Sequence, residues 1–75
     1  MNRITVDSSN LISVGYDSNT STLEIKFKDG STYHYFGIPE YVFNELLNAP
    51  SKGSYLHQNI KGKYNYQRVN WLKTW

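Results

Sequence analysis

Two short runs in the middle of the chain alternate apolar and polar residues, which is the period of a β-strand buried on one face only. The first run carries Leu23, Ile25 and Phe27 at every second position. The second run covers residues 31–36 and follows the turn-forming pair Asp29-Gly30. The pattern therefore predicts an antiparallel hairpin whose two strands are joined at that pair.

The length of the hairpin loop decides which face the tyrosines of the second run occupy. A two-residue turn would set Phe27 opposite Thr32, whereas a three-residue loop with a left-handed Gly30 would set it opposite Ser31. We choose the three-residue loop, because it puts the large side chains on one face and the polar ones on the other. The first face then holds Leu23, Ile25, Phe27, Tyr33 and Tyr35, and the second holds Glu24, Lys26, Thr32 and His34. On this interpretation the tyrosines are core residues with hydroxyls near the rim.

A third strand is expected before this hairpin. Ile12, Val14 and Tyr16 share one face of a strand over residues 11–16, and clusters of polar turn formers lie on both sides of it. Residues 3–6 alternate only weakly, so they form either an edge strand or an arm. The N-terminal half of the chain thus predicts a three-stranded antiparallel meander with one buried face.

The spacing of apolar residues changes to a helical period after residue 38. Pro39 suits the first turn of a helix, and Pro50 ends it because the residue before a proline avoids helical angles. The apolar residues between them repeat at a spacing of four and form one stripe, which we expect to pack on the tyrosine-bearing face of the sheet. The stripe consists of Val42, Phe43, Leu46 and Leu47.

A second, shorter helix is expected after this proline. Ser51 is its N-cap, Leu56 and Ile60 form its apolar side, and Gly62 is a natural stop. Residues 64–69 alternate again and form either a final strand or an extended tail. The expected fold is therefore α+β, with a three- or four-stranded antiparallel meander followed by two short helices packed on one face of the sheet.

An ordered set of residues along the chain is shared with a known domain. It consists of Ser8, Ser9, Ile12, Gly15, Tyr16, Asp17, Leu23, Phe27, Gly30, Tyr33, Tyr35, Pro39, Leu46, Ser51, Gly53, Ile60 and Tyr64. In this set the chain resembles the KTSC domain, a small module named after the C-terminus of some lysyl-tRNA synthetases that also occurs as a free-standing bacterial or phage protein. The resemblance implies one domain over residues 1–75, with a core from about residue 6 to 68 and a tail at 69–75. It also implies a non-catalytic module for which RNA binding has been suggested, and it brings no established site residues.

The composition excludes several kinds of site. The chain has no cysteine, which excludes disulfides and thiolate metal sites and fits a reducing cytoplasm. His34 and His57 stand alone, so we expect no metal and no cofactor, with His34 as an exposed partner of Glu24. No nucleophile elbow, paired-acid spacing or phosphate loop is present, so we do not expect an enzyme. Nothing resembles a signal peptide, and no apolar run approaches the roughly 20 residues of a membrane span, so we expect a cytoplasmic protein without a membrane partner.

Charge is divided unevenly along the chain. Residues 1–50 carry three basic and six acidic side chains, whereas residues 51–75 carry five basic side chains and no acidic one. Aromatic residues are interleaved with these cations, and single-stranded nucleic acid is held by cations along its backbone and by rings beneath its bases. We therefore predict RNA or another single-stranded nucleic acid as the partner. The candidate binding residues are Lys52, Lys61, Lys63, Tyr66, Arg68, Trp71 and Lys73.

The candidate residues have separate expected roles. Lys61, Lys63 and Arg68 are expected to contact phosphates, while Tyr66 and Trp71 stack on bases. Two other interpretations stay open. In one, the tyrosines of this third of the chain fill the core and its lysines only keep the surface solvated. In the other, the chain is a small protein-interaction factor that docks on a host protein or on a second copy of itself, through the edge strand and the C-terminal tryptophans Trp71 and Trp75.

Overall fold

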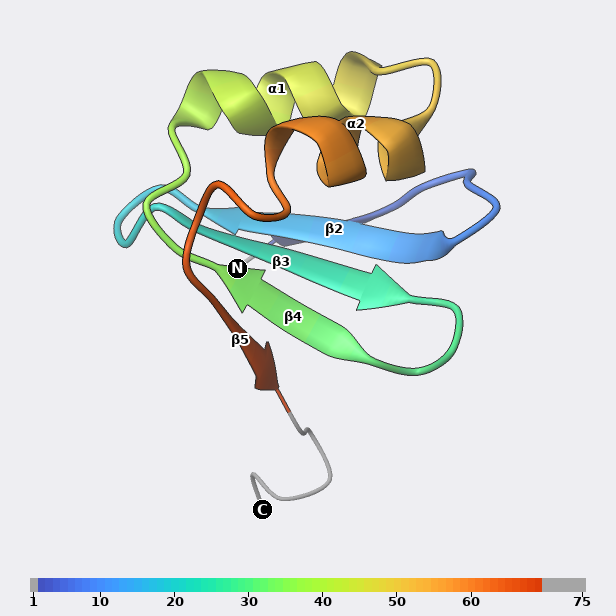
Figure 1. The fold of residues 1–75 in the computed structure, drawn as a ribbon, viewed down its shortest axis with the longest axis horizontal. Helices are drawn as coiled ribbons and strands as arrows, with labels where there is room; N and C mark the ends of the chain where they lie inside the picture. Colours follow the sequence, from blue (N-terminus) through green and yellow to red (C-terminus); the bar gives the residue numbers. More distant parts are fainter. Residues whose placement is uncertain (1, 70–75) are drawn as a thin grey trace.

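The computed structural model describes residues 2–69, and these form an antiparallel sheet covered on one face by two helices (Figure 1). The elements follow the order β1 (Asn2–Thr5), β2 (Leu11–Asp17), β3 (Thr22–Phe27), β4 (Thr32–Tyr35), α1 (Glu40–Asn48), α2 (Lys52–Asn59) and β5 (Tyr66–Val69). The strands are arranged in the same order in space, β1-β2-β3-β4-β5. The α+β prediction is confirmed, with five strands in place of three or four, because both segments that the sequence left open pair at the edges of the sheet.

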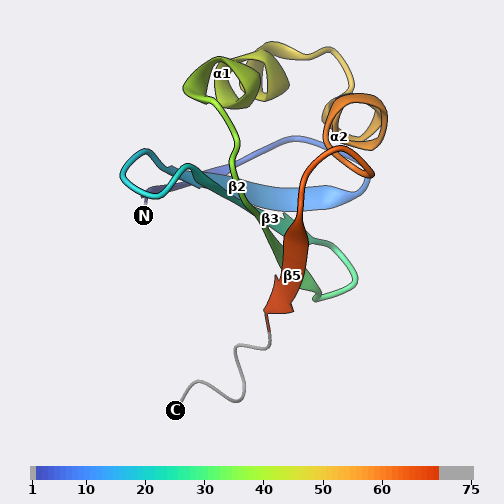
Figure 2. The ribbon, with the colours of Figure 1, turned by 60° about the vertical axis from the view of Figure 1, so that its left-hand side comes forward.

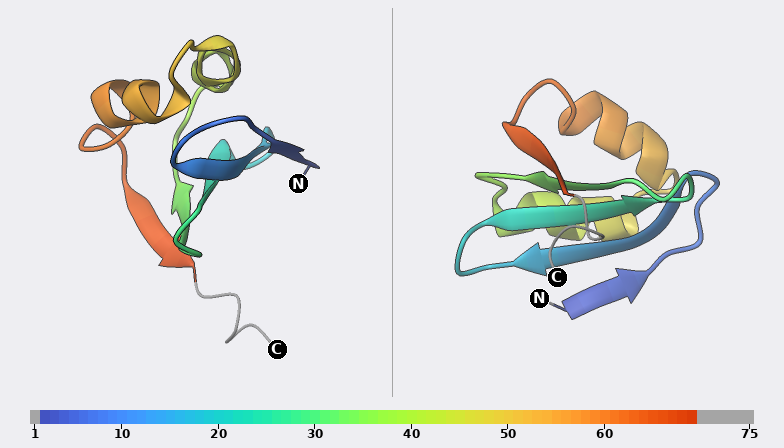
Figure 3. Two further views of the ribbon diagram at one scale, coloured as in Figure 1. Left: turned by 90° about the vertical axis from the view of Figure 1, so that its right-hand side faces the viewer. Right: turned by 90° about the horizontal axis from the view of Figure 1, so that it is seen from below.

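Both helices lie on one side of the sheet (Figures 2 and 3). The chain leaves β4, forms α1 and α2 above the sheet, and then returns so that β5 pairs antiparallel with β4. The helices therefore lie between β4 and β5 in the sequence, although these two strands are neighbours in the sheet. Neither helix in the described part of the chain is long and apolar enough to cross a membrane.

The hairpin of β3 and β4 has the predicted three-residue loop. Phe27 is paired with Ser31, whose carbonyl accepts a hydrogen bond from the Phe27 amide at 2.9 Å. Gly30 has a positive φ of 94°, which a residue with a Cβ rarely adopts. Ile25 consequently faces Tyr33 and Leu23 faces Tyr35, as the register argument required.

The prediction that Ile12 shares the face of Val14 and Tyr16 in β2 was wrong. The register against β3 shifts between Leu11 and Ser13, which marks a β-bulge at Ile12. A bulge adds one residue to a strand and reverses the alternation on one side of it. Leu11 is therefore fully buried beside Val14, while Ile12 points away from the core and is 37% exposed.

The ends of both helices agree closely with the sequence signals. Pro39 is the N-cap of α1, so the helix begins one residue later than predicted, and Ala49 before Pro50 is extended with ψ 138°. Ser51 caps α2, because its Oγ accepts a hydrogen bond from the Ser54 amide at 3.3 Å. The helices are joined by the Tyr55 hydroxyl, which donates to Glu45 at 2.6 Å.

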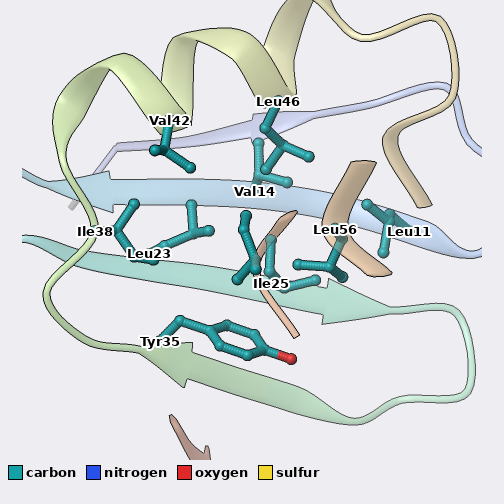
Figure 4. Packing of buried hydrophobic residues seen from close by; sticks show 10 residues of the cluster. Leu11, Val14, Leu23, Ile25, Tyr35, Ile38, Val42, Leu46 and Leu56 are labelled. Atoms are coloured by element: carbon teal, nitrogen blue, oxygen red, sulfur yellow. The ribbon is translucent and has the colours of Figure 1, made fainter. Parts of the chain in front are cut away.

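The hydrophobic core lies between the sheet and the two helices (Figure 4). Val42 and Leu46 of the predicted stripe are buried against the sheet, and Phe43 and Leu47 pack at the border of the core. Tyr35 closes the core on the β4 side, as the chosen register implies. The buried set is Leu11, Val14, Leu23, Ile25, Tyr35, Ile38, Val42, Leu46, Leu56 and Ile60.

The face of the sheet away from the helices carries a buried carboxylate. Glu24 lies on this face as predicted, but it is only 2% exposed. Arg3 of β1 donates two hydrogen bonds to it, and His34 Nε2 of β4 lies 2.9 Å from its Oε2. His34 thus has the expected partner, but it is half-buried where we expected it to be exposed. Burial raises the pKa of Glu24, whereas the hydrogen bonds and charges of Arg3 and His34 lower it. The lowering is the larger effect, so this pKa lies below its ordinary value.

Candidate nucleic-acid interface

An open pocket of about 490 Å³ lies on the helix-covered side of the sheet, where β4 and β5 meet the turn that follows α2. Four aromatic rings, one carboxylate and one ammonium group contribute to its walls. We call this the aromatic pocket. It is lined by Phe27, Asp29, Ser31, Tyr33, Tyr35, Lys61, Gly62 and Tyr66.

The register of β5 against β4 brings the rings of the pocket together. Tyr66 is paired with Tyr35, so its side chain lies on the same face. The Tyr66 ring centroid is 5.8 Å from that of Tyr33 and 5.7 Å from that of Tyr35. Phe27 adds an edge-on contact to Tyr33 at 5.7 Å. These distances are typical of interacting aromatic pairs.

The aromatic cluster extends from the core to the solvent. Tyr35 is buried, Tyr33 is half-buried, and Tyr66 is 61% exposed although it contacts both of them. Burial raises the pKa of Tyr35 above its ordinary value, with smaller contributions from Tyr33 and Tyr66, so its hydroxyl stays protonated at neutral pH. The outermost ring of the cluster, that of Tyr66, is therefore accessible to a ligand.

Lys61 reaches the pocket because the chain reverses at the end of α2. The Lys61 amide donates to the Leu56 carbonyl at 2.9 Å, and Gly62 then adopts a positive φ of 80°. This is the usual way in which a glycine ends a helix. The Lys61 ammonium lies 5.4 Å from the centroid of the Phe27 ring, within the range of a cation–π interaction.

Asp29 places a negative charge at the same pocket. Its Oδ1 accepts hydrogen bonds from the amide and the hydroxyl of Ser31, at 2.8 and 2.6 Å. The Ser31 hydroxyl and amide lower the pKa of Asp29 below its ordinary value, and the charge of Arg68 adds to this effect. The carboxylate is thus ionised at neutral pH and held in one orientation by its own loop.

The structure brings three of the predicted binding residues together. Lys61 and Tyr66 line the aromatic pocket, and Arg68 lies on the same face because it pairs with Tyr33. Lys63 is exposed in the same turn, where its amide donates to the Ile60 carbonyl at 3.1 Å.

The other predicted residues lie elsewhere or outside the described part of the chain. Lys52 is at the start of α2, about 12 Å along the helix from its end, and its ammonium donates to the Ala49 carbonyl at 3.4 Å. It therefore does not belong to the pocket. Trp71 and Lys73, like Trp75, lie outside the described residues.

Several pocket residues were not predicted as site residues. Tyr33, Tyr35 and Phe27 were assigned to the core, and Asp29 to a turn. The alternation of Tyr64, Tyr66 and Arg68 was the one signal that could have identified them, because a strand there must pair with an edge of the sheet. Among residues 2–69 no group of three or more His, Asp or Glu side chains is placed to hold a metal ion.

Comparisons with known proteins give a family match, several sequence relatives and a similar solved structure. The model of the KTSC domain family matches residues 7–64, a range that includes Lys61 but ends before Tyr66 and Arg68. A lysine–tRNA ligase of Trichormus variabilis is 51% identical over 55 residues, which cover 73% of this chain but 10% of that enzyme. This chain therefore spans about a tenth of the length of the ligases that it matches.

Two relatives are comparable in size to this chain. A protein of Stutzerimonas stutzeri is 38% identical over 71 residues, covering 93% of this chain and 100% of that protein. The crystal structure of a KTSC domain protein from Yersinia pestis aligns with a TM-score of 0.87 at 38% identity, covering 92% of this chain and 97% of that one. The fold described above is thus shared with an experimentally determined structure.

Proposed function

Because this chain belongs to the KTSC domain family, which also occurs within lysine–tRNA ligases, we propose that it is a non-enzymatic module that binds single-stranded RNA. The name of those enzymes identifies tRNA as what they act on. Fusion to such an enzyme supports an RNA ligand for the domain, and the chemistry of the aromatic pocket supports it independently.

The exposed ring of Tyr66 is the observation that carries this proposal. It is 61% exposed, its ring contacts those of Tyr33 and Tyr35 at tilted angles of 52° and 38°, Lys61 lines the same pocket, and Arg68 lies on the same face of the sheet. Stacking of a base on such a ring is worth about 1–3 kcal/mol. In this proposal the two cations contact the phosphates that flank the stacked base.

The roles of the remaining candidates follow from their positions. Lys63 is exposed in the turn beside Lys61, where it extends the phosphate-binding surface. Trp71 and Lys73 lie outside the described residues, and from the sequence alone we propose that they supply a further stacking ring and a further cation. We propose the weakest RNA contact for Lys52, because it lies at the end of α2 that is far from the pocket.

The ring contact is tested by titrating a fluorescently labelled mixed-sequence RNA with the protein. Tyr66→Ala should weaken binding by about 5- to 150-fold, which corresponds to one lost stacking contact. Tyr66→Phe keeps the ring and should bind as the natural protein does. Tyr41→Ala is the matched control, since Tyr41 is 63% exposed but lies on α1, away from the pocket. Equal affinity of the Tyr66→Ala variant and the Tyr41→Ala variant would contradict the proposed site.

The phosphate contacts are tested by the salt dependence of the same titration. Each phosphate contact of a single strand contributes about −0.7 to the slope of log affinity against log salt. The double variant Lys61→Glu with Lys63→Glu should make this slope shallower by about 1.4 and weaken binding at low salt. Lys52→Glu is the control and should change the slope little. RNA affinity that is untouched by the double variant would refute the proposed mechanism.

A second candidate function is a protein-interaction factor, and one feature of the sheet favours it. All four residues of β1 are exposed, and among residues 2–69 this strand pairs with β2 alone. An open strand edge of this kind can accept a strand from a host protein or from a second copy of the chain. A concentration-dependent change of mass in analytical ultracentrifugation, with RNA affinity that is absent at low salt, would favour this alternative over RNA binding.

A further inference from the structure

We infer that the aromatic pocket prefers guanine to the other three RNA bases, an inference that rests on the proposed RNA binding and specifies its ligand. It depends on the polar groups that the pocket walls present between the rings. These groups are the Asp29 carboxylate and the Lys61 ammonium.

The carboxylate of Asp29 has one oxygen available to a ligand. Its Oδ1 is occupied by the amide and the hydroxyl of Ser31, whereas its Oδ2 accepts no hydrogen bond from another residue within residues 2–69. An ionised carboxylate can only accept hydrogen bonds. Because Ser31 fixes the orientation of the group, little conformational entropy is lost when a ligand donates to it.

Guanine is the base that satisfies such an acceptor best. Its Watson–Crick edge presents two neighbouring donors, the ring N1–H and the exocyclic N2 amino group. Uracil has one ring N–H between two carbonyl oxygens. Adenine and cytosine each have one amino group beside an unprotonated ring nitrogen. In those three bases a lone pair faces the carboxylate next to the donor, and the resulting repulsion favours guanine.

The ammonium group in the pocket lining complements the acceptor edge of the same base. Guanine O6 and N7 accept hydrogen bonds, and lysine or arginine is their commonest protein partner. The Lys61 ammonium is held 5.4 Å from the Phe27 ring centroid, and when guanine occupies the pocket it contacts this edge in place of a phosphate. The rings of Tyr33 and Tyr66 supply flat surfaces for a purine, and a volume of about 490 Å³ is within the range of small-molecule sites.

The preference is measured with four oligouridine RNAs that carry one central guanosine, adenosine, cytidine or inosine. The guanosine RNA should bind about 5- to 150-fold more tightly than the adenosine and cytidine RNAs. This is the discrimination that one bidentate hydrogen-bonded contact to a base provides. Inosine lacks the N2 amino group and should lie between guanosine and adenosine. Equal affinity for all four RNAs would overturn the inference while leaving the proposed RNA binding intact.

A conservative variant tests whether Asp29 causes the preference. In Asp29→Asn the amide oxygen can still accept from Ser31, so the loop should keep its conformation, while Oδ2 is replaced by a donor. The variant should show a smaller preference for guanosine over adenosine than the natural protein. Asp17→Asn is the matched control, since Asp17 Oδ1 accepts from the Asn19 amide at 3.0 Å in a similar turn between β2 and β3.

The two proposals fail in different ways. If the natural protein binds none of the RNAs at low salt, the proposed function itself is refuted, and the guanine inference with it. If RNA binds and Tyr66→Ala weakens it, but Asp29→Asn keeps the guanosine preference of the natural protein, then only the inference about Asp29 is wrong. Thermal unfolding followed by circular dichroism verifies that Asp29→Asn and Asp17→Asn are folded.

Discussion

Glu24 is held on the outer face of the sheet by residues from the two strands that flank β2 and β3. Arg3 of β1 and His34 of β4 both contact its carboxylate, which is almost fully buried. Burying a carboxylate costs free energy unless charge-assisted hydrogen bonds compensate for it. The three residues therefore connect β1, β3 and β4 across the intervening strand β2.

Replacing this carboxylate should destabilise the fold. We expect Glu24→Gln to lower the free energy of unfolding by about 1–3 kcal/mol, because Arg3 and His34 lose a charged acceptor. Urea denaturation monitored by circular dichroism measures the loss. Asp7→Asn is the control, since Asp7 is exposed, and it should change the free energy of unfolding little. A loss of equal size in both variants would contradict the role assigned to Glu24.

The same contact makes stability depend on pH. The pKa of Glu24 in the folded chain lies below its ordinary value of 4.5, so the unfolded chain binds protons more readily at this residue. Its contribution to stability is therefore fully present above pH 4.5 and is lost as the pH falls through the lower pKa of the folded state. Urea midpoints at several acidic pH values should fall less steeply for Glu24→Gln than for the natural protein. Parallel curves would show that Glu24 is not the responsible group.

The turn after α2 is the element that positions the pocket's cation. Gly62 has a φ of 80°, while a Cβ at this position would meet no atom within 4 Å. Any penalty for a side chain here thus comes from the backbone conformation alone. Gly53 differs, because it lies inside α2 without a positive φ, and a Cβ there would be in ordinary contact with Asn10 at 3.5 Å.

Alanine at these two glycines should have opposite effects. Gly62→Ala forces a left-handed alanine and should destabilise the fold by about 1–2 kcal/mol. Gly53→Ala restricts the unfolded chain inside a helix and should stabilise the fold by about 0.5–1 kcal/mol. Both effects are measured as shifts in urea midpoint. Destabilisation by both substitutions to the same extent would show that packing, rather than backbone conformation, dominates at Gly62.

Elements that depend on local signals were predictable, and those that depend on pairing were not. The β3–β4 hairpin follows from Asp29-Gly30 and the alternation around it, so even its register could be predicted. The bulge at Ile12 exists only in the relation of β2 to β3, and nothing in the alternation of β2 reveals it. The burial of Glu24 likewise depends on partners from β1 and β4.

The candidate site shows the same division. Lys61, Tyr66 and Arg68 were predicted from their composition and spacing, because cations and rings alternate in that part of the chain. Tyr33 and Asp29 were not, because their role requires β5 to lie beside β4 after two intervening helices. Such a non-local pairing leaves no short-range pattern in the sequence. A site formed across it can be predicted only in part.

At the scale of the whole molecule, one small core supports both the sheet and the helices. A chain of 75 residues buries little surface, so each large apolar side chain is a substantial part of its stability. Leu46 is fully buried between α1 and the sheet, whereas Leu47 beside it is only partly buried. The two leucines therefore provide a matched pair on one helix.

Truncating these leucines should have unequal effects. Leu46→Ala should lower the free energy of unfolding by about 2–5 kcal/mol, since it removes buried methyl groups and leaves a cavity. That loss is a large share of the roughly 5–15 kcal/mol available to a typical domain. Leu47→Ala should cost clearly less. Calorimetric melting temperatures compare the two variants, and a larger decrease for Leu47→Ala would contradict the assigned core.

The position of β5 at the edge of the sheet affects the order in which parts of the structure unfold locally. Within the described part of the chain this four-residue strand pairs with β4 alone and is mostly exposed, so it should detach more readily than the central strands. Its detachment removes Tyr66 from the aromatic pocket while the rest of the sheet persists. Ligand occupancy and closure of this last strand are thus thermodynamically linked, and amide hydrogen exchange in Tyr66–Val69 should slow when the pocket is filled.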